Sequence, residues 1–171
     1  MKEKVILFCL LIISIMSHAQ EINTIIYDEI AEENILIGNC NKEGFASDDF
    51  KYWFQDEYDN YNIDIETTDQ INPGLTPVIK IKLVMGTWCE DSHREVPRII
   101  KILEFTEFDF NNLSIVGVNR NKKAEGSGVD QLNIELVPTI IFYLDEKEIG
   151  RIIESPKESL EKDMLKIIST N

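Results

Sequence analysis

Cys89 is the residue of this sequence best placed to do chemistry. It lies in the segment from Gly86 to Ser92, where a β-rich apolar stretch ends and a long amphipathic stretch begins. The first turn of a helix offers unpaired backbone N–H groups and the positive end of the helix dipole, which stabilise a thiolate. Because the thiolate is the nucleophile in disulfide exchange, we expect Cys89 to be a reactive thiol.

The charged neighbours of Cys89 act in opposite directions. Glu90 and Asp91 place two negative charges beside the sulfur, and these oppose the helix dipole and disfavour the thiolate. His93 and Arg94 compensate in part if their side chains turn toward the site. The sequence leaves the sign of this balance open, and a lone histidine in a first helical turn also fits a solvated surface residue.

Two further residues bear on how a disulfide at Cys89 would be resolved. Ser92 carries a hydroxyl, which cannot displace a thiolate. This chain therefore cannot run the usual cycle in which a second cysteine forms an intramolecular disulfide with the first. Cys40 has three interpretations: a buried inert residue, a disulfide partner and resolving thiol for Cys89, or a free exposed thiol. We expect no metal site, because two cysteines and one histidine remain after residue 19 and no ligand spacing recurs.

The elements that must position Cys89 alternate between strand and helix patterns. We predict strands over 78–85, 113–118, 139–144 and 148–153, helices over 92–105 and 158–168, a loop over 121–128 and a helical turn over 130–133. The order strand, helix, strand, loop, hairpin, helix predicts an α/β fold in which helices cover both faces of a mixed sheet.

Residues 20–74 are predicted to form a helical N-terminal extension, in which the pattern of 22–33 is ambiguous. A strong turn signal, Asn72-Pro73-Gly74, separates it from the α/β unit at 75–171. Within the extension we expect a short strand at 35–37 and a short helix over 64–70. A longer helix is expected after Ser47, with an apolar face formed by Phe50, Trp53, Phe54, Tyr58 and Tyr61. We expect this face to dock on the α/β unit, because exposed apolar patches of that size are unusual.

Residues 1–19 have the parts of a secretory signal peptide. Lys2 and Lys4 precede an apolar run that includes Cys9, and Ser17-His18-Ala19 supplies the small residues of a cleavage site. The run is shorter than the roughly 20 residues of a membrane-spanning helix. We therefore predict cleavage after Ala19, no membrane attachment afterwards, and a periplasmic or secreted protein in an oxidising compartment.

The charge of the chain limits its partners. Its formal net charge is -14, with 31 acidic residues against 17 lysines and arginines. A chain this acidic repels nucleic acid and anionic lipid, so we expect neither as a partner.

Three motifs together resemble the thioredoxin superfamily. They are Trp88-Cys89-x-x-Ser92, Pro97 eight residues after Cys89, and Val137-Pro138-Thr139. The resemblance covers about residues 77–168. Within it, residues 85–98 resemble exported bacterial thioredoxin-like proteins that have an N-terminal extension.

The resemblance implies a thioredoxin-like fold with a cis-proline at Pro138 beside Cys89. The backbone at Val137 and Pro138 would pair with substrate, and Trp88 would shield the sulfur. Three features depart from the family. Ser92 replaces the second cysteine, Leu83 stands where the family has a buried acid, and Glu90 and Asp91 place two negative charges beside the sulfur.

The function that follows is monothiol thiol–disulfide exchange through Cys89 in cell redox homeostasis. Its partners would be protein or small-molecule disulfides and thiols, with no cofactor. The alternative is a non-catalytic module that binds a peptide or protein on a thioredoxin scaffold, because a fold does not by itself fix a function.

Overall fold

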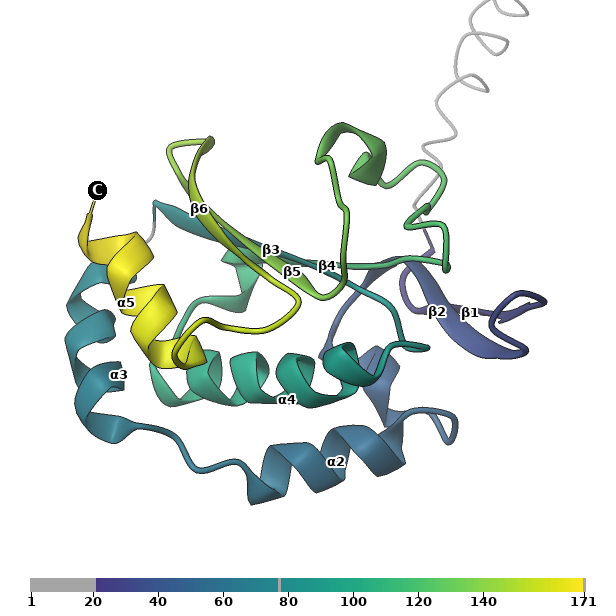
Figure 1. Cartoon of the computed structure of the whole chain (residues 1–171), viewed down its shortest axis with the longest axis horizontal. Coiled ribbons are helices and arrows are strands. Elements are labelled where there is room, and N and C mark those ends of the chain that lie inside the picture. The colour runs from purple at the N-terminus through teal and green to yellow at the C-terminus, as the bar shows by residue number, and fades with distance from the viewer. Residues whose placement is uncertain (1–20, 77, 171) are drawn as a thin grey trace, which may run out of the picture.

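The computed structural model describes residues 21–76 and 78–170. The predicted signal peptide, with Cys9, lies outside the described residues. Six strands form one sheet in the order β1-β2-β4-β3-β5-β6 (Figure 1). The strands are β1 Thr24–Asp28, β2 Glu33–Cys40, β3 Ile79–Met85, β4 Leu113–Gly117, β5 Thr139–Leu144 and β6 Lys147–Ile153.

The helices follow the predicted order in the C-terminal unit. The α-helices are α2 Lys51–Asn60, α3 Ile65–Ile71, α4 Glu90–Phe105 and α5 Leu160–Ser169. Short 3-10 turns are η1 Lys42–Ala46, η2 Asn72–Gly74, η3 Phe110–Asn112 and η4 Val129–Gln131. Ser159 caps α5, its hydroxyl accepting from the backbone N–H of Lys162 at 3.2 Å, which satisfies one of the free N–H groups at that end.

The strand directions define an α/β thioredoxin-like fold. β3 is parallel to β4 and antiparallel to β5, and β5 is antiparallel to β6. The parallel pair is joined through α4, while β5 and β6 form a hairpin that α5 follows. The carboxyl ends of β3 and β4 therefore meet at one edge, and the Cys89 loop leaves the sheet from that edge.

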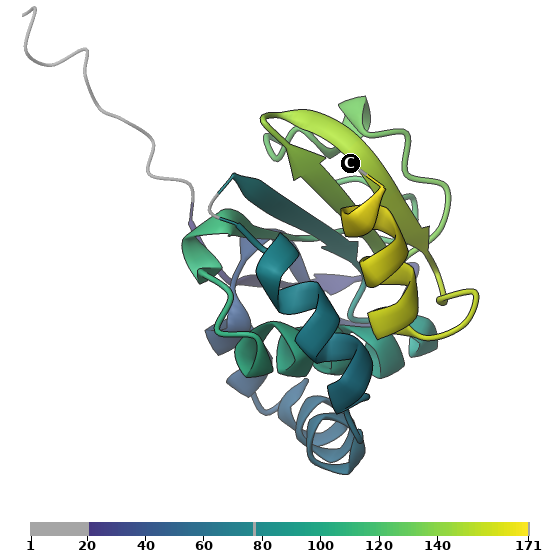
Figure 2. The same ribbon diagram turned by 90° about the vertical axis from the view of Figure 1, so that its left-hand side faces the viewer.

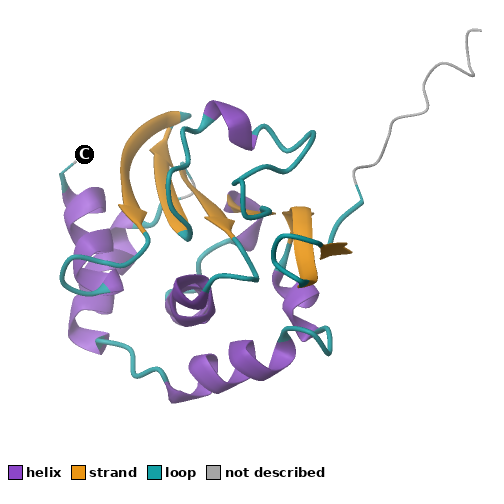
Figure 3. Ribbon diagram, turned by 45° about the vertical axis from the view of Figure 1, so that its right-hand side comes forward, coloured by secondary structure: helices purple, strands orange, loops and turns teal. Residues whose placement is uncertain are grey.

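The α-helices described here cover one face of the sheet, whereas we expected helices on both. The main core joins apolar side chains of that face to residues of the helices, among them Leu83 on β3, Ile99 on α4 and Met164 on α5. Figures 1 and 3 show these helices on one side of the strands and the turn η4 on the other. Along the opposite face, Val84 and Val116 pack with residues of the segment that leads into β5. The expectation was wrong here because residues 118–138 form only the short turn η4, and Gly126 and Gly128 in this segment have positive φ values of 74° and 76°, which do not fit a helix.

The extension contains the two predicted helices, α2 and α3, and also a hairpin that we did not expect. Residues 24–40 form the hairpin β1–β2, and β2 joins the main sheet by pairing antiparallel with β4. The side chain of Asp28 stabilises the turn between the two strands. Its carboxylate accepts hydrogen bonds from the backbone N–H groups of Ile30 and Ala31 at 3.0 and 2.7 Å. The sequence pattern of 22–33 is ambiguous, and strand pairing decides it.

The aromatic face of the extension docks on the α/β unit, as expected. Phe50 and Phe54 are 2% and 6% exposed and belong to the main core, with Trp53 packed against it. Helices α3 and α5 also pack together at the opposite end of the helical layer (Figure 2). Helix α2 begins at Lys51 and not directly after Ser47, because residues 47–50 form a separate turn, in which the backbone N–H of Phe50 donates to the Ser47 carbonyl at 3.0 Å.

Candidate functional site

Cys89 is the N-cap residue of α4, and its side chain is half-buried. Its Sγ lies 3.2 Å from the backbone oxygen of Val137, to which the thiol donates a hydrogen bond. The Val137–Pro138 peptide bond is cis and directly precedes β5. The structure therefore brings the two motifs of the sequence together, although they lie 48 residues apart.

Trp88, the residue before Cys89, is held in place by its side-chain contacts. Its indole N–H donates to the backbone oxygen of Val118 at 2.7 Å, and the Arg120 guanidinium lies 5.0 Å from the ring centre. The ring lies against Gly86, where a Cβ would come within 2.5 Å of it. Gly86 therefore leaves the space that Trp88 occupies. The sequence identifies Trp88 but gives no signal for Arg120, because its contact with the ring exists only in the folded chain.

Thr87, two residues before Cys89, is held from two sides. Its Oγ1 accepts from the backbone N–H of Leu36 on β2 at 3.1 Å. Its backbone oxygen lies 2.6 Å from Nε2 of His93, which must be the donor because a carbonyl only accepts. The His93 ring in turn stacks on Trp53 of α2, with ring centres 4.3 Å apart. Residues of the extension thus brace the loop that carries Cys89, and sequence reasoning did not identify Thr87 or Leu36.

Ser92, three residues beyond Cys89, is fully buried. Its Oγ accepts from the backbone N–H of Gly86 at 3.3 Å, which ties the first turn of α4 to the end of β3. This hydroxyl has a structural partner in the interior and no thiol chemistry of its own.

The charged residues that follow Cys89 are largely paired with one another. Arg94 donates to Asp91 at 2.6 Å, to Glu95 at 2.7 Å and to the hydroxyl of Ser155 at 2.8 Å. The hydrogen bond to Glu95, more than the one to Asp91, raises the pKa of the Arg94 guanidinium. Arg94 thus offsets the charge of Asp91 directly, while Glu90 remains exposed.

An interior acid is present, but on α4 and not on β3. Leu83 on β3 is buried among apolar residues. Glu95 on α4 is 3% exposed, and its Oε1 faces Arg94 and Arg98 at 2.7 and 3.7 Å. Its Oε2 is buried without a hydrogen-bond partner among the described residues. Sequence reasoning missed Glu95, because an acid on a helix pattern ordinarily marks a solvated face.

Cys40 is a buried free thiol at the end of β2. It lies in the core beneath the helices, whereas Cys89 packs at the edge of the cluster on the other face of the sheet. Its thiol points to the backbone oxygen of Ile115 at 3.7 Å, and burial raises its pKa from 9.0 to about 12. Both cysteines are free, so the structure contains no Cys40–Cys89 disulfide.

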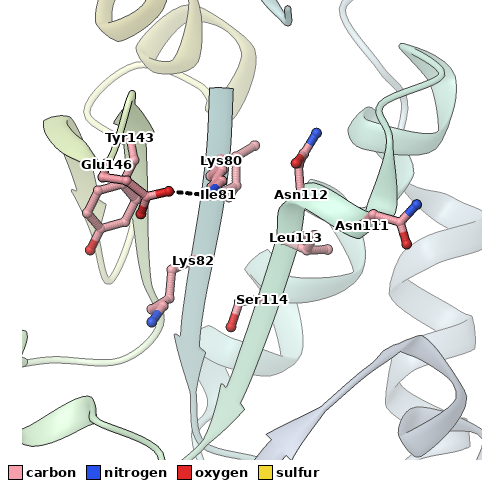
Figure 4. Close-up of a pocket in the computed structure, with 9 residues that line it drawn as sticks. All are labelled: Lys80, Ile81, Lys82, Asn111, Asn112, Leu113, Ser114, Tyr143 and Glu146. Carbon is pink, nitrogen blue, oxygen red and sulfur yellow. Dashed lines mark hydrogen bonds and ion pairs between the residues drawn. The ribbon is translucent and has the colours of Figure 1, made fainter. Parts of the chain in front are cut away.

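A separate pocket of about 380 Å³ lies toward the amino ends of β3 and β4, at the end of the sheet away from Cys89. Figure 4 shows Lys80 and Lys82 along β3 in this pocket, with Lys80 paired to Glu146 across it. None of the predicted site residues lines it. Within residues 21–76 and 78–170, no group of three or more potential metal ligands occurs. In the same ranges, no helix has the length and apolar character needed to cross a bilayer.

Solved structures resemble this chain, whereas no sequence family matches it. No protein-family model and no curated protein matches the chain. Among solved structures, it is similar to a protein of unknown function from Pseudomonas aeruginosa, with 14% identity, a TM-score of 0.46, and 70% of this chain and 81% of that one covered. It is also similar to thioredoxin O1 from Arabidopsis thaliana, with 16% identity, a TM-score of 0.40, and 61% and 88% covered. A third match is Trxlp from Edwardsiella tarda, with 17% identity, a TM-score of 0.40, and 63% and 94% covered. The roles of individual residues therefore rest on the geometry of this chain.

Proposed function

We propose that this chain is a monothiol thiol–disulfide exchange protein whose reacting atom is Cys89 Sγ. The observation that carries the proposal is the half-buried Cys89 thiol at the start of α4, 3.2 Å from the backbone oxygen of Val137. The free N–H groups of the first turn stabilise a thiolate at this position. The indole N–H of Trp88 donates to the backbone oxygen of Val118, which holds the ring beside the loop that carries Cys89.

The exchange takes place in two steps. The Cys89 thiolate attacks one sulfur of a partner disulfide, forming a new S–S bond to Cys89 and releasing the other partner sulfur as a thiolate. An outside thiol, on a small molecule or a protein, then attacks the mixed disulfide as its thiolate and regenerates the Cys89 thiolate. The outside thiol is required because Ser92 has a hydroxyl and Cys40 is buried with a pKa of about 12.

The compartment belongs to the same proposal. The signal-peptide pattern of residues 1–19 favours export to the periplasm or the exterior, where disulfide substrates persist. Mass spectrometry of the exported protein should give a mature chain that starts at Gln20. Retention of Met1–Ala19 in the mature protein would argue against export by cleavage.

A thiol titration tests the chemistry. Purified protein is mixed with glutathione disulfide at neutral pH, and the mixed disulfide is followed by mass. Wild type and Cys40→Ser should both acquire one glutathione at Cys89, faster than a free cysteine peptide does. Cys89→Ser should acquire none. Equal modification of Cys89→Ser and wild type would contradict the proposal.

The burial of Ser92 favours a second candidate, a binding module without catalysis. Ser92 fills the position of the second thiol and is bonded to the Gly86 N–H. Such a module would bind a polypeptide beside Val137 and Pro138 with unchanged affinity after Cys89→Ser. Slow Cys89 modification together with that unchanged affinity would make the module the better description.

A further inference from the structure

The hairpin β1–β2 presents an unusual amount of apolar surface. Residues 22–30 carry large apolar side chains that are between 39% and 63% exposed, namely Ile22, Ile25, Ile26, Tyr27 and Ile30. β1 is also an edge strand, with β2 on one side and no described strand on the other. A solvent-exposed apolar edge strand is a template for pairing with another chain, and proteins normally protect such edges.

The charged residues of the hairpin itself have one sign only. Between residues 21 and 41 the sequence has no lysine or arginine. The acidic residues of the same stretch are Glu21, Asp28, Glu29, Glu32 and Glu33. A partner that covers the apolar side chains therefore meets several carboxylates, and a segment that carries lysine or arginine complements them. A second copy of this chain would place the same carboxylates opposite one another.

The hairpin also lies beside the loop of Cys89. β2 pairs with β4 through residues 38–40 only, and residues 33–37 run on past Gly117 at the carboxyl end of β4 while they pair with β1. In Figure 1 the hairpin projects beyond that end of the sheet. Ile37 packs in the same cluster as Trp88 and Cys89, and the Leu36 N–H holds Thr87.

We propose that the outer edge of β1 is a docking site for an extended polypeptide segment that alternates apolar and basic residues. The segment adds as a further strand through the free N–H and C=O groups of β1, and its basic side chains meet the carboxylates of the hairpin. The inference deepens the proposed function and rests on it: the disulfide partner of Cys89 is a polypeptide that the hairpin holds. Ile26 supplies apolar contact on the face shared with Ile37, because cross-strand partners and residues two apart lie on one face.

The docking step is tested with a probe that has no cysteine. A fluorescently labelled short peptide of alternating lysine and valine is titrated into the mature protein, with a glutamate–valine peptide as control. We expect the lysine–valine peptide to bind and the glutamate–valine peptide not to bind. The affinity of the lysine–valine peptide should fall as the salt concentration rises. The double variant Ile26→Lys/Tyr27→Lys should bind at least about tenfold more weakly, since it loses apolar contact and gains like charge.

Matched surface variants distinguish peptide binding at the hairpin from a non-specific effect of the protein's net charge. Tyr52→Lys changes a tyrosine that is 82% exposed on α2 and should leave binding unchanged. Glu29→Lys/Glu33→Lys should weaken binding, whereas Glu66→Lys/Asp69→Lys, with the same charge change on exposed residues of α3, should not. Equal binding by the hairpin variants and wild type would place the peptide elsewhere and overturn the proposal.

Two further measurements keep docking and exchange apart. Cys89→Ser should bind the lysine–valine peptide as wild type does, because the probe has no sulfur. If wild type reacts with glutathione disulfide but does not bind the peptide, the docking site is wrong and exchange stands. If the peptide binds but Cys89 does not react, docking stands and exchange fails. A concentration-dependent dimer in sedimentation, lost in Ile26→Lys/Tyr27→Lys, would assign the edge to a second copy and also overturn the proposal.

Discussion

The contacts around Cys89 run mainly to backbone atoms. Its Sγ meets the oxygen of Val137, the indole of Trp88 meets the oxygen of Val118, and the hydroxyl of Ser92 meets the N–H of Gly86. Backbone partners depend on the path of the chain, so they persist when neighbouring side chains change. The thiol can therefore keep its position at the start of α4 without a second cysteine.

Replacing Ser92 with cysteine should restore a dithiol site. Residues 89 and 92 lie three apart at a helix start, and side chains at that spacing share a face. We expect Ser92→Cys to form a disulfide with Cys89 under mild oxidation and to gain a modest dithiol reductase activity toward insulin. Wild type should show none in the same turbidity assay.

The size of this gain depends on proton acceptors near the site. Leu83 supplies none, so Ser92→Cys/Leu83→Asp should be more active than Ser92→Cys and less stable, because a carboxylate is buried. If the introduced thiol forms a disulfide readily with Cys89 and yet no reductase activity is measured, the surroundings of Cys89 do not support catalysis. The binding module would then be the better description.

Among the elements, β2 and α2 are the ones that hold the Cys89 loop. β2 provides the Leu36 N–H for Thr87 Oγ1, and α2 provides the Trp53 ring on which His93 stacks. Both belong to the extension, so the extension is part of the framework that positions Cys89.

Removing the His93 ring should loosen this loop. His93→Ala loses the 2.6 Å hydrogen bond to the Thr87 oxygen and the stack on Trp53. We expect the free energy of unfolding to fall by about 1–3 kcal/mol and Cys89 to react more slowly with glutathione disulfide. Urea denaturation and the modification rate measure the two effects.

The control for this prediction keeps an aromatic ring at position 53 of α2, on which His93 of α4 stacks. Trp53→Phe retains an aromatic ring beside His93 and should retain most of the rate. A rate unchanged in His93→Ala, despite lower stability, would limit His93 to a structural role.

At the scale of the whole molecule, the extension and the α/β unit share one core. Phe45, Phe50 and Phe54 of the extension belong to the same cluster as Ile99 and Leu103 of α4. Tyr61 adds a polar link at the other end, because its hydroxyl donates to the buried Glu161 of α5 at 2.9 Å. The boundary near Asn72-Pro73-Gly74 is a surface turn between two segments that share this core.

Residues 75–171 should therefore not fold alone. Their separation from residues 21–74 exposes the apolar face of α4 and leaves β4 without its neighbour β2. We expect the fragment to show no cooperative thermal transition, whereas the chain from Gln20 onward should show one. A cooperative transition in the fragment, measured by circular dichroism, would make the α/β unit an independent domain.

Stability should decline in alkali. Burial raises the pKa of Cys40 to about 12, and burial together with Glu104 raises the pKa of Tyr58 to about 12. Burial and then Glu161 raise the pKa of Tyr61 as well. Because these groups release their protons more easily when unfolded, the free energy of unfolding is constant below their unfolded pKa values and falls as pH rises from about 9 toward 12.

Urea denaturation across this range checks the sign. Each group contributes at most about 1.4 kcal/mol per pH unit between its unfolded and folded pKa values. Cys40→Ala should flatten the earliest part of the decline, since the unfolded thiol titrates first, at its usual pKa of 9.0. Stability that rises between pH about 9 and about 11 would contradict the assignment.

The sequence by itself determined the elements of the C-terminal unit and the placement of Cys89 and Pro138 at their ends. The strands over 139–144 and 113–117 and the helix ending at Phe105 follow from patterns of two and 3.6 residues, which are local properties of the chain. The motifs around Cys89 and Pro138 lie at the ends of these elements, so the fold places them together once the element order is known.

Only the tertiary structure decided what surrounds that site. Residues 24–28 become a strand because β2 is available as a partner, and β2 is held in turn by β4. Whether Cys40 lies near Cys89 or beneath the helices depends on which face of β2 it occupies, and the burial of Glu95 depends on how α4 sits against its neighbours. These outcomes depend on contacts between residues far apart in the chain, and no local pattern encodes them.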